Sequence, residues 1–503
     1  MSYLGIDVGT TGCKVVAFDE EGKIVALSYR EYPLYYPQTG WIELDAEEVY
    51  QAVEDSLLEI SQKLRHDPPC SLAISSQGEA VVPVGEKGEC LARSIVTFDQ
   101  RGDEFVPFWE EKIGRKRFFE LTGTSLSGIG TVNKILWWKK YKQEVFEKAR
   151  YFLCFEDFIV HRLGVEPAIS FSLAGRTMMF EVKKEKWSEE ILSLAGIDPA
   201  RLARPLPSGE VVGEVASSFA QKMGWKEKVI VATGGHDQPC GALGSGVIKP
   251  ALAMDATGTV ECIAPALGEL VLSPVMEENN LCCYHHAFPS LYLTMVYNFT
   301  GGALLRWFRD NFAQKEKEIA ERENCDVYDL ILARIPSQPT NIWVLPHFTT
   351  TGTPYFDTQS AGVIVGLKLE TSREEFIKAL LEGVSYEMKF NLELLSQAGV
   401  KVERLRAVGG GAKSPAWLQI KADVYGLPVE ALSVTEAASL GAALLGRRAK
   451  EGIEDFAGLI NKLVKVREVY EPDEERNALY EERFEVYKRI YPALKNHIWK
   501  GEK

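Results

Sequence analysis

Residues 7–14, DVGTTGCK, have the types and spacing of a loop that binds a polyphosphate and its metal. The two glycines let backbone N–H groups converge on phosphate oxygens, and Thr10 and Thr11 add hydroxyl donors. Lys14 offers a compact positive charge for a terminal phosphate. Asp7 requires a cation such as Mg2+ between its carboxylate and a phosphate, because the two anions repel each other. The segment also fits an ordinary hairpin turn, since FDEEGKIV follows it as a candidate return strand.

A second loop with similar chemistry opens the second half of the chain. Residues 254–259, MDATGT, place a Thr-Gly-Thr turn after an apolar strand, much as residues 7–11 do near the N-terminus. Two such loops facing each other across a cleft could hold a triphosphate from both sides. The candidate phosphate-binding residues of this second loop are Thr257, Gly258 and Thr259.

A glycine run in the last third of the chain suits the nucleoside end of a nucleotide. Residues 409–414, GGGAKS, let a flat base or ribose approach the backbone, and Ser414 before Pro415 has the signature of a helix N-cap. Tight strand-to-helix packing without a ligand is the alternative. The pattern GxxxxGK[ST] is missing, so the protein is not a P-loop NTPase. The candidate nucleotide-binding residues here are Gly410, Gly411 and Ala412.

The candidate catalytic base is Asp237, in the motif GGHDQ at the end of the strand VIVAT. A carboxylate held on a glycine turn beside a phosphate site can accept a hydroxyl proton as phosphoryl transfer proceeds. His236 is the rival base, but in a loose transition state positioning counts for more than basicity. An Asp after two glycines is by itself more often a turn residue. The assignment therefore depends on the neighbouring motifs.

Polar side chains in the first half of the chain are suited to the hydroxyl groups of a polyol. The motif SSQGE (75–79) ends another predicted strand, and TFDQR (97–101) follows it. The sugar side is therefore expected in the first half and the nucleotide side in the second. Asp99 and Arg101 fit a structural ion pair equally well. The candidate substrate-binding residues are Gln77, Gly78, Glu79, Asp99, Arg101, Asp237 and Gln238.

The same order of elements recurs in the two halves of the chain, with hairpin-connected strands, a helix, and a further strand that ends at a motif. In the first half these are the strands 3–9, 14–19 and 23–31, the helix 45–65 and the strand 71–78. In the second half they are the strands 252–264 and 291–299, the helix 376–399 and the strand 402–411. This predicts an α/β fold of two related domains, residues 1–246 and 247–503, with a helical extension at 450–503.

Length and composition limit the class of protein. At 503 residues the chain exceeds one ordinary core, and 46% hydrophobic with 25% charged residues is typical of a globular protein. The formal charge of −14 disfavours nucleic acid and anionic membranes as partners. The sequence has neither a signal peptide nor an apolar run long enough to cross a bilayer, so we expect a cytoplasmic protein.

Nine cysteines are scattered without a CxxC motif, which predicts reduced thiols rather than a disulfide framework. One cluster, Cys282, Cys283, His285 and His286, contains ligand types that zinc uses. It lacks a two-plus-two spacing, and we expect these side chains to pack or to line a substrate pocket instead.

Taken in order, these motifs resemble the FGGY family of carbohydrate kinases, within the larger actin, Hsp70 and hexokinase group. The resemblance runs from Tyr3 to Arg447. Besides the motifs above, it includes a TxxKxxWW stretch at 131–138 and, at 361–383, a segment close to the second family signature. Each motif is short, but their joint order is specific.

The resemblance implies two RNase H-like domains that flank a deep cleft, close over a sugar and MgATP, and transfer the γ-phosphoryl group to a hydroxyl. It implies that Asp237 is the catalytic base and that Asp7 lies near Mg2+. The implied ATP contacts are Thr10, Thr11, Lys14, Thr257, Gly258, Thr259, Gly410, Gly411 and Ala412. The expected partners are a sugar or polyol and ATP, and a homodimer is one open assembly.

Departures from two branches of the family bear on the substrate. Glycerol kinases carry Arg-Glu where this chain has Gly78 and Glu79, a Trp near Thr97 and a Tyr near Ile129. The smaller or apolar residues here predict a roomier pocket. Xylulokinases carry Met-His at the first pair and Asp-Asn in place of Asp-Gln at 237–238. We therefore expect a ketose or sugar alcohol larger than glycerol, with glycerol as the alternative.

A different class also fits the phosphate motifs, namely an actin- or Hsp70-like ATPase whose nucleotide cycle drives conformational change. Such a protein would hydrolyse ATP without any sugar. The carboxylates on the sugar side, Glu79 and Asp237, favour the kinase.

Overall fold

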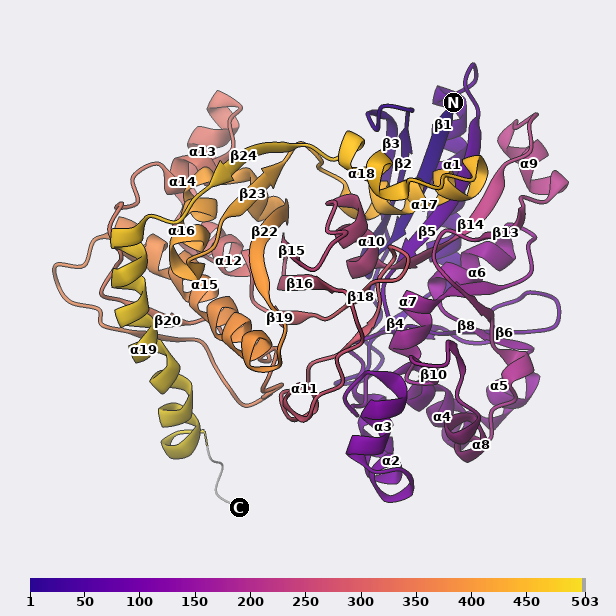
Figure 1. Ribbon diagram of the computed structural model, residues 1–503, viewed down its shortest axis with the longest axis horizontal. Coiled ribbons are helices and arrows are strands. Elements are labelled where there is room, and N and C mark those ends of the chain that lie inside the picture. Colours follow the sequence, from indigo (N-terminus) through magenta and orange to yellow (C-terminus); the bar gives the residue numbers. More distant parts are fainter. Residues whose placement is uncertain (500–503) are drawn as a thin grey trace.

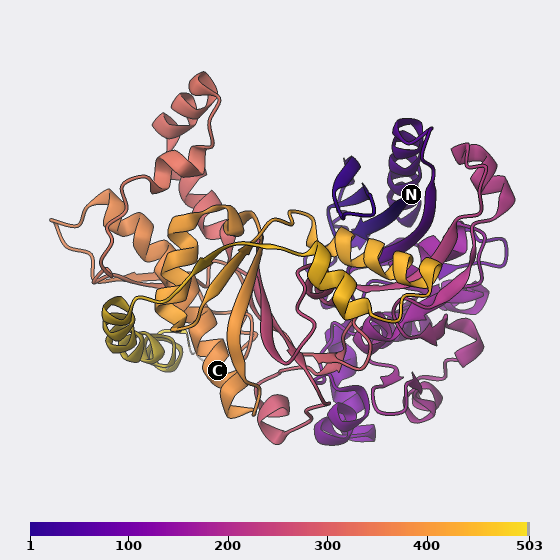
Figure 2. The ribbon, with the colours of Figure 1, turned by 45° about the horizontal axis from the view of Figure 1, so that its top comes forward.

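The computed structural model describes residues 1–499 and contains two α/β domains on either side of a cleft (Figure 1 and Figure 2). Each domain is built on a sheet of the same topology. Three central strands are parallel, two antiparallel strands extend the sheet on one side, and one antiparallel strand ends it on the other. The predicted α/β class with two related domains is therefore confirmed.

The first sheet has the strand order β13-β14-β5-β1-β2-β3, and the second has β24-β23-β22-β15-β16 with β19 beside β16. The first comprises β1 (Ser2–Val8), β2 (Gly12–Phe18), β3 (Ile24–Glu31), β5 (Pro69–Ser76), β13 (Val211–Glu214) and β14 (Ile230–His236). The second comprises β15 (Ala251–Thr257), β16 (Glu261–Leu267), β19 (Val296–Asn298), β22 (Val402–Gly409), β23 (Val429–Leu432) and β24 (Val466–Tyr470). Two short strands, β17 (Tyr284–His285) and β18 (Tyr292–Leu293), extend it beyond β16.

The central strands are apolar because helices cover both faces of the first sheet. All eight residues of β5 are buried, as expected for a parallel strand enclosed on both sides. Helix α1 (Ala46–Lys63) packs on β2 and β3, and α17 (Ala437–Glu451) packs across β1, β5 and β14. The predicted helix 45–65 is α1, with Asp45 as its N-cap.

Helix α17 lies late in the sequence but packs on the first sheet, where Figure 1 shows it in yellow beside the indigo strands. Small residues allow this contact. A Cβ on Gly5 of β1 would lie 1.7 Å from the carbonyl oxygen of Ser439. A Cβ on Gly441 would lie 2.0 Å from the carbonyl oxygen of Cys240 in α10 (Asp237–Gly244). The segment 435–443 is thus a packing element between the two halves of the chain.

The helices of the second domain begin at the caps that their sequences predict. Helix α15 (Arg373–Gln397) starts with a capping box of Ser372 and Glu375. Helix α16 (Pro415–Tyr425) has the predicted N-cap, because the Ser414 side chain accepts the Trp417 N–H. None of the helices formed by residues 1–499 combines the length and the apolar character that a bilayer crossing needs.

The predicted helical extension is only partly helical. It contains α18 (Phe456–Leu463) and α19 (Glu474–His497), but β24 lies between them as an edge strand of the second sheet. Its final residues, 500–503, lie outside the described part of the chain. The first sheet ends with β14 and the second begins with β15, and Gly246 falls in the segment between them. In Figure 2, helices α13 (Gln314–Glu323) and α14 (Val327–Leu332), drawn in salmon, project from the second domain.

Candidate active site

Three carboxylates gather at the carboxyl ends of β1, β5 and β14. Asp7 lies on β1, Glu79 follows β5, and Asp237 follows β14. The strand register pairs Asp7 with Ser75 and Ser75 with Gly235. The charges of Asp7 and Glu79 both raise the pKa of Asp237, so the three groups act on one another electrostatically. Open α/β sheets bind ligands at this edge.

Asp237 is the first residue of α10, and its carboxylate is set up to take a proton near neutral pH. Its side chain keeps 32% of its surface exposed. Burial by the surrounding protein, followed by repulsion from Asp7 and Glu79, raises its pKa to about 7. A general base works best when its pKa lies near the working pH.

The glycines before Asp237 do not form the predicted turn. Gly234 and Gly235 belong to β14, which continues to His236. A Cβ on Gly234 would lie 1.8 Å from the carbonyl oxygen of Ile74 on β5, so the close approach of the two strands requires glycine. The turn prediction was wrong, and the strand itself delivers Asp237 to the edge of the sheet.

The first phosphate-type loop is a tight hairpin between β1 and β2, in which the Gly9 N–H donates to the Gly12 carbonyl at 3.0 Å. Gln77 braces it. Its Nε2 donates to the Gly9 carbonyl at 3.2 Å, and its Oε1 accepts from the Thr10 hydroxyl at 3.2 Å. Thr11 is exposed at the tip. The segment therefore forms the hairpin that was one of the two interpretations, and Gln77 contacts this loop rather than the cleft.

Lys14 lies opposite Asp7 across the β1–β2 ladder. Its Nζ is 2.7 Å from Oε2 of Glu436, the residue before α17. Burial raises the pKa of Asp7, while the Ser75 hydroxyl, which donates to Asp7 Oδ1 at 2.7 Å, and the Lys14 charge oppose that rise. Asp7 thus has a hydrogen-bonded oxygen but no direct cationic partner among the described residues.

Glu79 is paired with a residue that the sequence patterns did not indicate. Arg176 Nε donates to Glu79 Oε1 at 2.6 Å, and both side chains are buried. Glu79 has the left-handed backbone φ of 59°, and Lys134 Nζ donates to its carbonyl at 2.8 Å. A non-glycine residue held in this conformation marks a position that the surrounding structure over-determines.

Asp99 and Arg101 form the structural ion pair that was one of the two predicted alternatives. Arg101 donates through Nε at 2.9 Å and Nη2 at 2.7 Å to the two oxygens of Asp99. The guanidinium also lies 4.3 Å from the ring centroid of Trp41 and 4.7 Å from that of Trp137, and these two rings pack edge to face against each other. Arg101 is thus sequestered, whereas Asp99 also lines the cleft.

The space beside Gly78 is filled by side chains from other elements. A Cβ at Gly78 would lie 3.0 Å from His236 Nε2 and 3.6 Å from Arg176 Cγ. The Thr97 hydroxyl donates to the Gly78 carbonyl at 2.6 Å and so is directed at the backbone. The lack of a side chain at Gly78 therefore does not enlarge the pocket as expected.

A cavity of about 780 Å³ lies between the domains, and its lining includes Asp99 but not Glu79 or Asp237. The first domain contributes Asp99, Asp103, Ile129 and Arg176 to its wall, and the second contributes Thr259, Asn280, Cys282 and Tyr297. Hydroxyl, amide and carboxylate groups alternate with aromatic rings, which is the chemistry of a sugar site.

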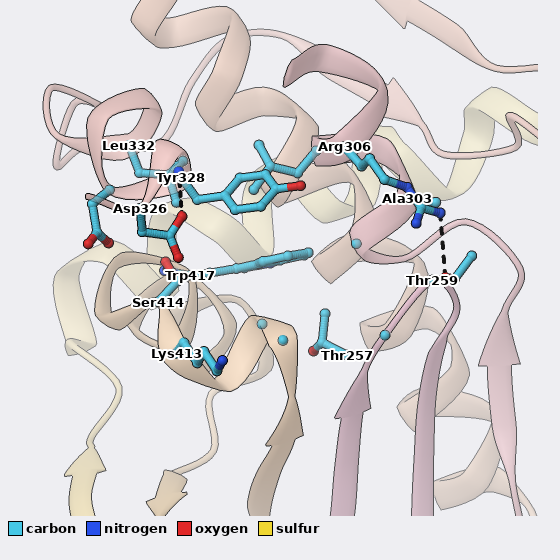
Figure 3. A pocket seen from close by; sticks show the side chains of 16 residues that line it. Thr257, Thr259, Ala303, Arg306, Asp326, Tyr328, Leu332, Lys413, Ser414 and Trp417 are labelled. Atoms are coloured by element: carbon cyan, nitrogen blue, oxygen red, sulfur yellow. Dashed lines mark hydrogen bonds between the residues drawn. The ribbon is translucent and has the colours of Figure 1, made fainter. Parts of the chain in front are cut away.

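A second pocket, of about 300 Å³, lies within the second domain, and Figure 3 shows its lining side chains. Thr257, Gly258 and Thr259 of the second loop form part of its wall, together with Gly410 and Gly411. Tyr328 and Trp417 bring aromatic rings to it, and Arg306 Nη2 lies 3.5 Å from Thr259 Oγ1. Three of these residues, Arg306, Tyr328 and Trp417, were missed from the sequence. Trp417 carries a signal, an aromatic residue in the first turn after the glycine run, but Tyr328 has none.

The glycine run at 409–411 serves both packing and the pocket. Gly409 has φ 82°, and a Cβ on Gly411 would lie 2.5 Å from Thr257 Cβ. Gly410 has no atom closer than 3.9 Å to such a Cβ and faces the pocket. Ala412, also a predicted contact, packs against the hydrophobic core instead.

A buried lysine anchors the second loop. Lys421 Nζ on α16 donates to Asp255 Oδ2 at 2.8 Å, to Thr257 Oγ1 at 2.6 Å and to Glu261 Oε1 at 2.5 Å. Burial by itself would lower the pKa of Lys421, but the two carboxylates outweigh it and raise that pKa. The network fixes Thr257 at the wall of the nucleotide-type pocket.

The cysteine and histidine cluster is dispersed. Cys282 lines the interdomain cavity, and Cys283 accepts a backbone hydrogen bond. His285 Nε2 lies 3.0 Å from Glu185 Oε1, and His286 accepts a backbone N–H. Within residues 1–499, no group of three or more His, Cys, Asp or Glu side chains is arranged to hold a metal ion.

Comparison with known proteins agrees with this geometry. The N-terminal domain of the FGGY family of carbohydrate kinases matches residues 2–244, and its C-terminal domain matches residues 270–449. A xylulose kinase of Staphylococcus epidermidis is 27% identical over 500 residues, 98% of this chain and 97% of that kinase. A gluconokinase of Bacillus licheniformis is 28% identical over 497 residues, 98% of this chain and 96% of that protein.

The solved structure of a ligand-bound xylulose kinase from Lactobacillus acidophilus superimposes with a TM-score of 0.89 at 24% identity, covering 99% of each chain. That likeness supports the fold, and the two domain matches identify the family. The chain belongs to the FGGY family of carbohydrate kinases, phosphotransferases that use an alcohol group as acceptor.

Proposed function

We propose that the protein transfers the γ-phosphoryl group of MgATP to a hydroxyl of a neutral ketose or sugar alcohol larger than glycerol, with Asp237 as general base. The observation that carries the proposal is the carboxylate of Asp237, which has a pKa of about 7 and lies beside Asp7 of the phosphate-type loop and Glu79 of the sugar side. Asp237 accepts the proton of the attacking hydroxyl while that oxygen bonds to the γ-phosphorus and the bond to ADP breaks.

ATP bridges the two domains in this proposal. Tyr328 and Trp417 offer apolar faces for the base, and Gly410 and Gly411 let the ribose approach the backbone. The phosphates extend from the second loop, residues 257–259, toward the first. There Thr10, Thr11 and Lys14 provide hydroxyl and ammonium donors. Residues 1–246 thus bind mainly the sugar, and residues 247–503 mainly the nucleotide.

Asp7 has the chemistry of a Mg2+ ligand. Its half-buried carboxylate repels Asp237, and the nearest cation, Lys14, is already paired with Glu436. Mg2+ commonly binds one or two carboxylates together with substrate phosphates, so a single acidic residue is sufficient. When bound, the ion would neutralise charge on the phosphates during transfer.

The charges on the cavity wall favour an uncharged substrate. Among the described residues that line the cavity, Arg176 is the only cation, and it is paired with Glu79. Asp99 and Asp103 line the same cavity, and burial raises the pKa of Asp103. A carboxylate on the substrate would meet these acids without a free cation, whereas sugar hydroxyls can donate to them. A neutral ketose therefore fits better than an aldonate.

A coupled ADP-release assay with MgATP tests the proposal. The panel comprises glycerol, xylitol, xylulose, ribulose, fructose and gluconate, each compared with a reaction that lacks sugar. We expect at least about tenfold stimulation by a neutral pentulose, hexulose or pentitol, and rates near the sugar-free rate with glycerol and gluconate. Asp237→Asn should abolish the stimulation.

Each other outcome identifies the part of the proposal that fails. Stimulation by gluconate alone would overturn the charge argument, and stimulation by glycerol alone would overturn the size argument. ADP release that no sugar changes would favour an ATPase over a kinase. Full activity of Asp237→Asn would rule out Asp237 as the base.

A further inference from the structure

A chain of three side chains connects the second domain to Asp237. Tyr284 Oη lies 3.0 Å from His236 Nδ1, and His236 Nε2 lies 3.2 Å from Asp237 Oδ1. Tyr284 belongs to β17 of the second sheet, whereas His236 ends β14 of the first. The chain therefore crosses from one domain to the other and ends on the carboxylate at the centre of the site.

Burial leaves the side chains of Tyr284, His236 and Asp237 few other hydrogen-bond partners. His236 is 5% exposed and Tyr284 is fully buried. Asp237 Oδ1 is enclosed and makes no hydrogen bond among the described residues, although His236 Nε2 lies 3.2 Å from it. An enclosed carboxylate oxygen without a donor is costly, so the nearby imidazole nitrogen is its natural partner.

The protonation states fix the direction of the hydrogen bonds. Burial, together with the Arg176 guanidinium, holds the pKa of His236 well below its usual range, so the imidazole is neutral and carries one N–H. An ionised Asp237 needs a donor, which places the hydrogen on Nε2. Nδ1 then accepts from the Tyr284 hydroxyl, whose only other partner within residues 1–499 is the weak acceptor Met295 Sδ at 3.2 Å.

We infer that Tyr284 and His236 are positioning residues that hold Asp237 through Oδ1 and so direct its second oxygen, Oδ2, at the sugar hydroxyl. The inference rests on the proposed role of Asp237 as base and adds two residues to it. Tyr284 fixes the tautomer of His236, and His236 fixes the orientation of the carboxylate. Because Tyr284 comes from the second domain, the base is aligned only while the domains keep this arrangement.

Other groups also act on this chain, and a test must separate their effects. The titratable or charged side chains that act on Asp237 or His236 from neighbouring elements are Asp7, Glu79, Arg176, Cys262 and Tyr284. None of the variants below changes Asp7, Glu79, Arg176 or Cys262. A shift in the pH profile of a variant therefore reports on the contacts that connect Tyr284, His236 and Asp237.

Tyr284→Phe removes only the hydroxyl and keeps the ring that lies 5.4 Å from the Arg176 guanidinium. With xylulose, or the most active sugar of the panel above, and saturating MgATP, we expect kcat to fall about tenfold or more while the sugar KM stays within about twofold. Loss of the aligned donor should also raise the pKa of Asp237, which moves the acid limb of kcat/KM to higher pH. If Tyr284 had only a structural role, the acid limb of the kcat/KM profile would stay at its wild-type pH.

Variants of His236 provide an independent comparison. Glutamine can still donate an N–H near the Nε2 position and leucine cannot, so His236→Gln should retain more activity than His236→Leu, with a smaller pH shift. Tyr292→Phe removes a hydroxyl from the neighbouring strand β18 and should change neither kcat nor the pH limb. Should His236→Leu fail to fold, Tyr284→Phe alone decides the matter.

Two results would be informative in different ways. In the first, Tyr284→Phe keeps the wild-type kcat and the wild-type position of the acid limb, while Asp237→Asn is inactive. This would overturn the positioning role of Tyr284 and His236 and leave the kinase proposal intact. An active Asp237→Asn would instead overturn the proposed base, and the chain with it.

Discussion

Asp7 and Asp255 both precede a phosphate-type loop, but they lie on opposite faces of their sheets. Val8 pairs with Ser76 and Thr257 with Gly409, the last residue of the adjacent parallel strand in each case. The position equivalent to Asp7 is therefore Ala256, and Asp255 lies one residue earlier. A shift of one residue reverses the direction of a strand side chain. Asp7 thus shares a face of the first sheet with Lys14, whereas Asp255 is buried against Lys421.

Because of this difference, we expect substitution of Asp7 to impair catalysis and substitution of Asp255 to destabilise the fold. Asp7→Asn should lower kcat by at least about 100-fold and raise the Mg2+ concentration needed for half-maximal activity, because the metal loses a carboxylate. Removing this charge also removes a repulsion that raises the pKa of Asp237, so any residual activity should have its acid limb at lower pH. Activity titrations with Mg2+ at several pH values measure both effects. An unchanged Mg2+ requirement would exclude Asp7 as a ligand.

Asp255→Asn, in contrast, should destabilise the fold. It leaves the buried Lys421 ammonium without its ionised partner, which costs roughly 3–5 kcal/mol. Burial, with repulsion from Asp255 opposed by Lys421, raises the pKa of Glu261 to about 8, so this side chain holds a proton at pH 7. Glu261→Gln should therefore cost less than about 1 kcal/mol. Urea unfolding of both variants at pH 7 measures the two free energies of unfolding. Equal losses of stability would contradict the assignment of the negative charge to Asp255 rather than to Glu261.

Much of the fold could be predicted because the signals are local. Apolar strands of period two, the Asp45 and Ser414 caps and the repeated order of elements all act within a few residues. The position of Asp237 followed from the same reasoning, since it comes directly after an apolar strand. The glycines before it were misread as a turn, because only the distance from Gly234 to Ile74 reveals that they pack inside the sheet.

Most of the contacts that tune the site could not be predicted, because they join distant segments. Arg176 and Glu79 are separated by 97 positions, and Lys421 and Asp255 by 166. No local pattern marks a lysine in the middle of a helix as the partner of a loop. Gly78 illustrates the same limit, since its missing side chain suggested an empty space that His236 in fact occupies.

Arg176 should determine sugar binding rather than nucleotide binding. Arg176→Met removes the only cation on the described cavity wall and should raise the sugar KM about tenfold or more, with the ATP KM unchanged. It also leaves Glu79 buried and unpaired, so the fold should lose stability. The double variant Arg176→Met with Glu79→Gln should recover stability without recovering the sugar KM. Recovery of both would mean that the ion pair serves only the fold.

Glu156 links catalytic geometry to pH, because it holds the strand that delivers Asp237. Its Oε1 accepts the Gly234 N–H at 2.8 Å, and its Oε2 accepts the Ser170 hydroxyl at 2.7 Å. Burial raises its pKa from 4.5 to about 7, so between these values the folded state keeps a proton that the unfolded chain has released. Glu156 therefore makes its full contribution to the stability of the folded state below about pH 4.5. That contribution decreases as the pH rises and is lost by about pH 7. The loss is on the order of 3 kcal/mol.

Glu156→Gln removes this titration and keeps side-chain groups that can bond to Gly234 and Ser170. Its stability relative to the wild type should therefore rise between pH 5 and pH 8, by up to about 3 kcal/mol. Urea unfolding of both proteins at the two pH values measures the change, and other titrating groups cancel in the difference. Glu89→Gln, at an exposed carboxylate, is the control and should give no such trend. A stability difference that stays constant with pH would mean that Glu156 is already ionised in the folded protein at pH 5.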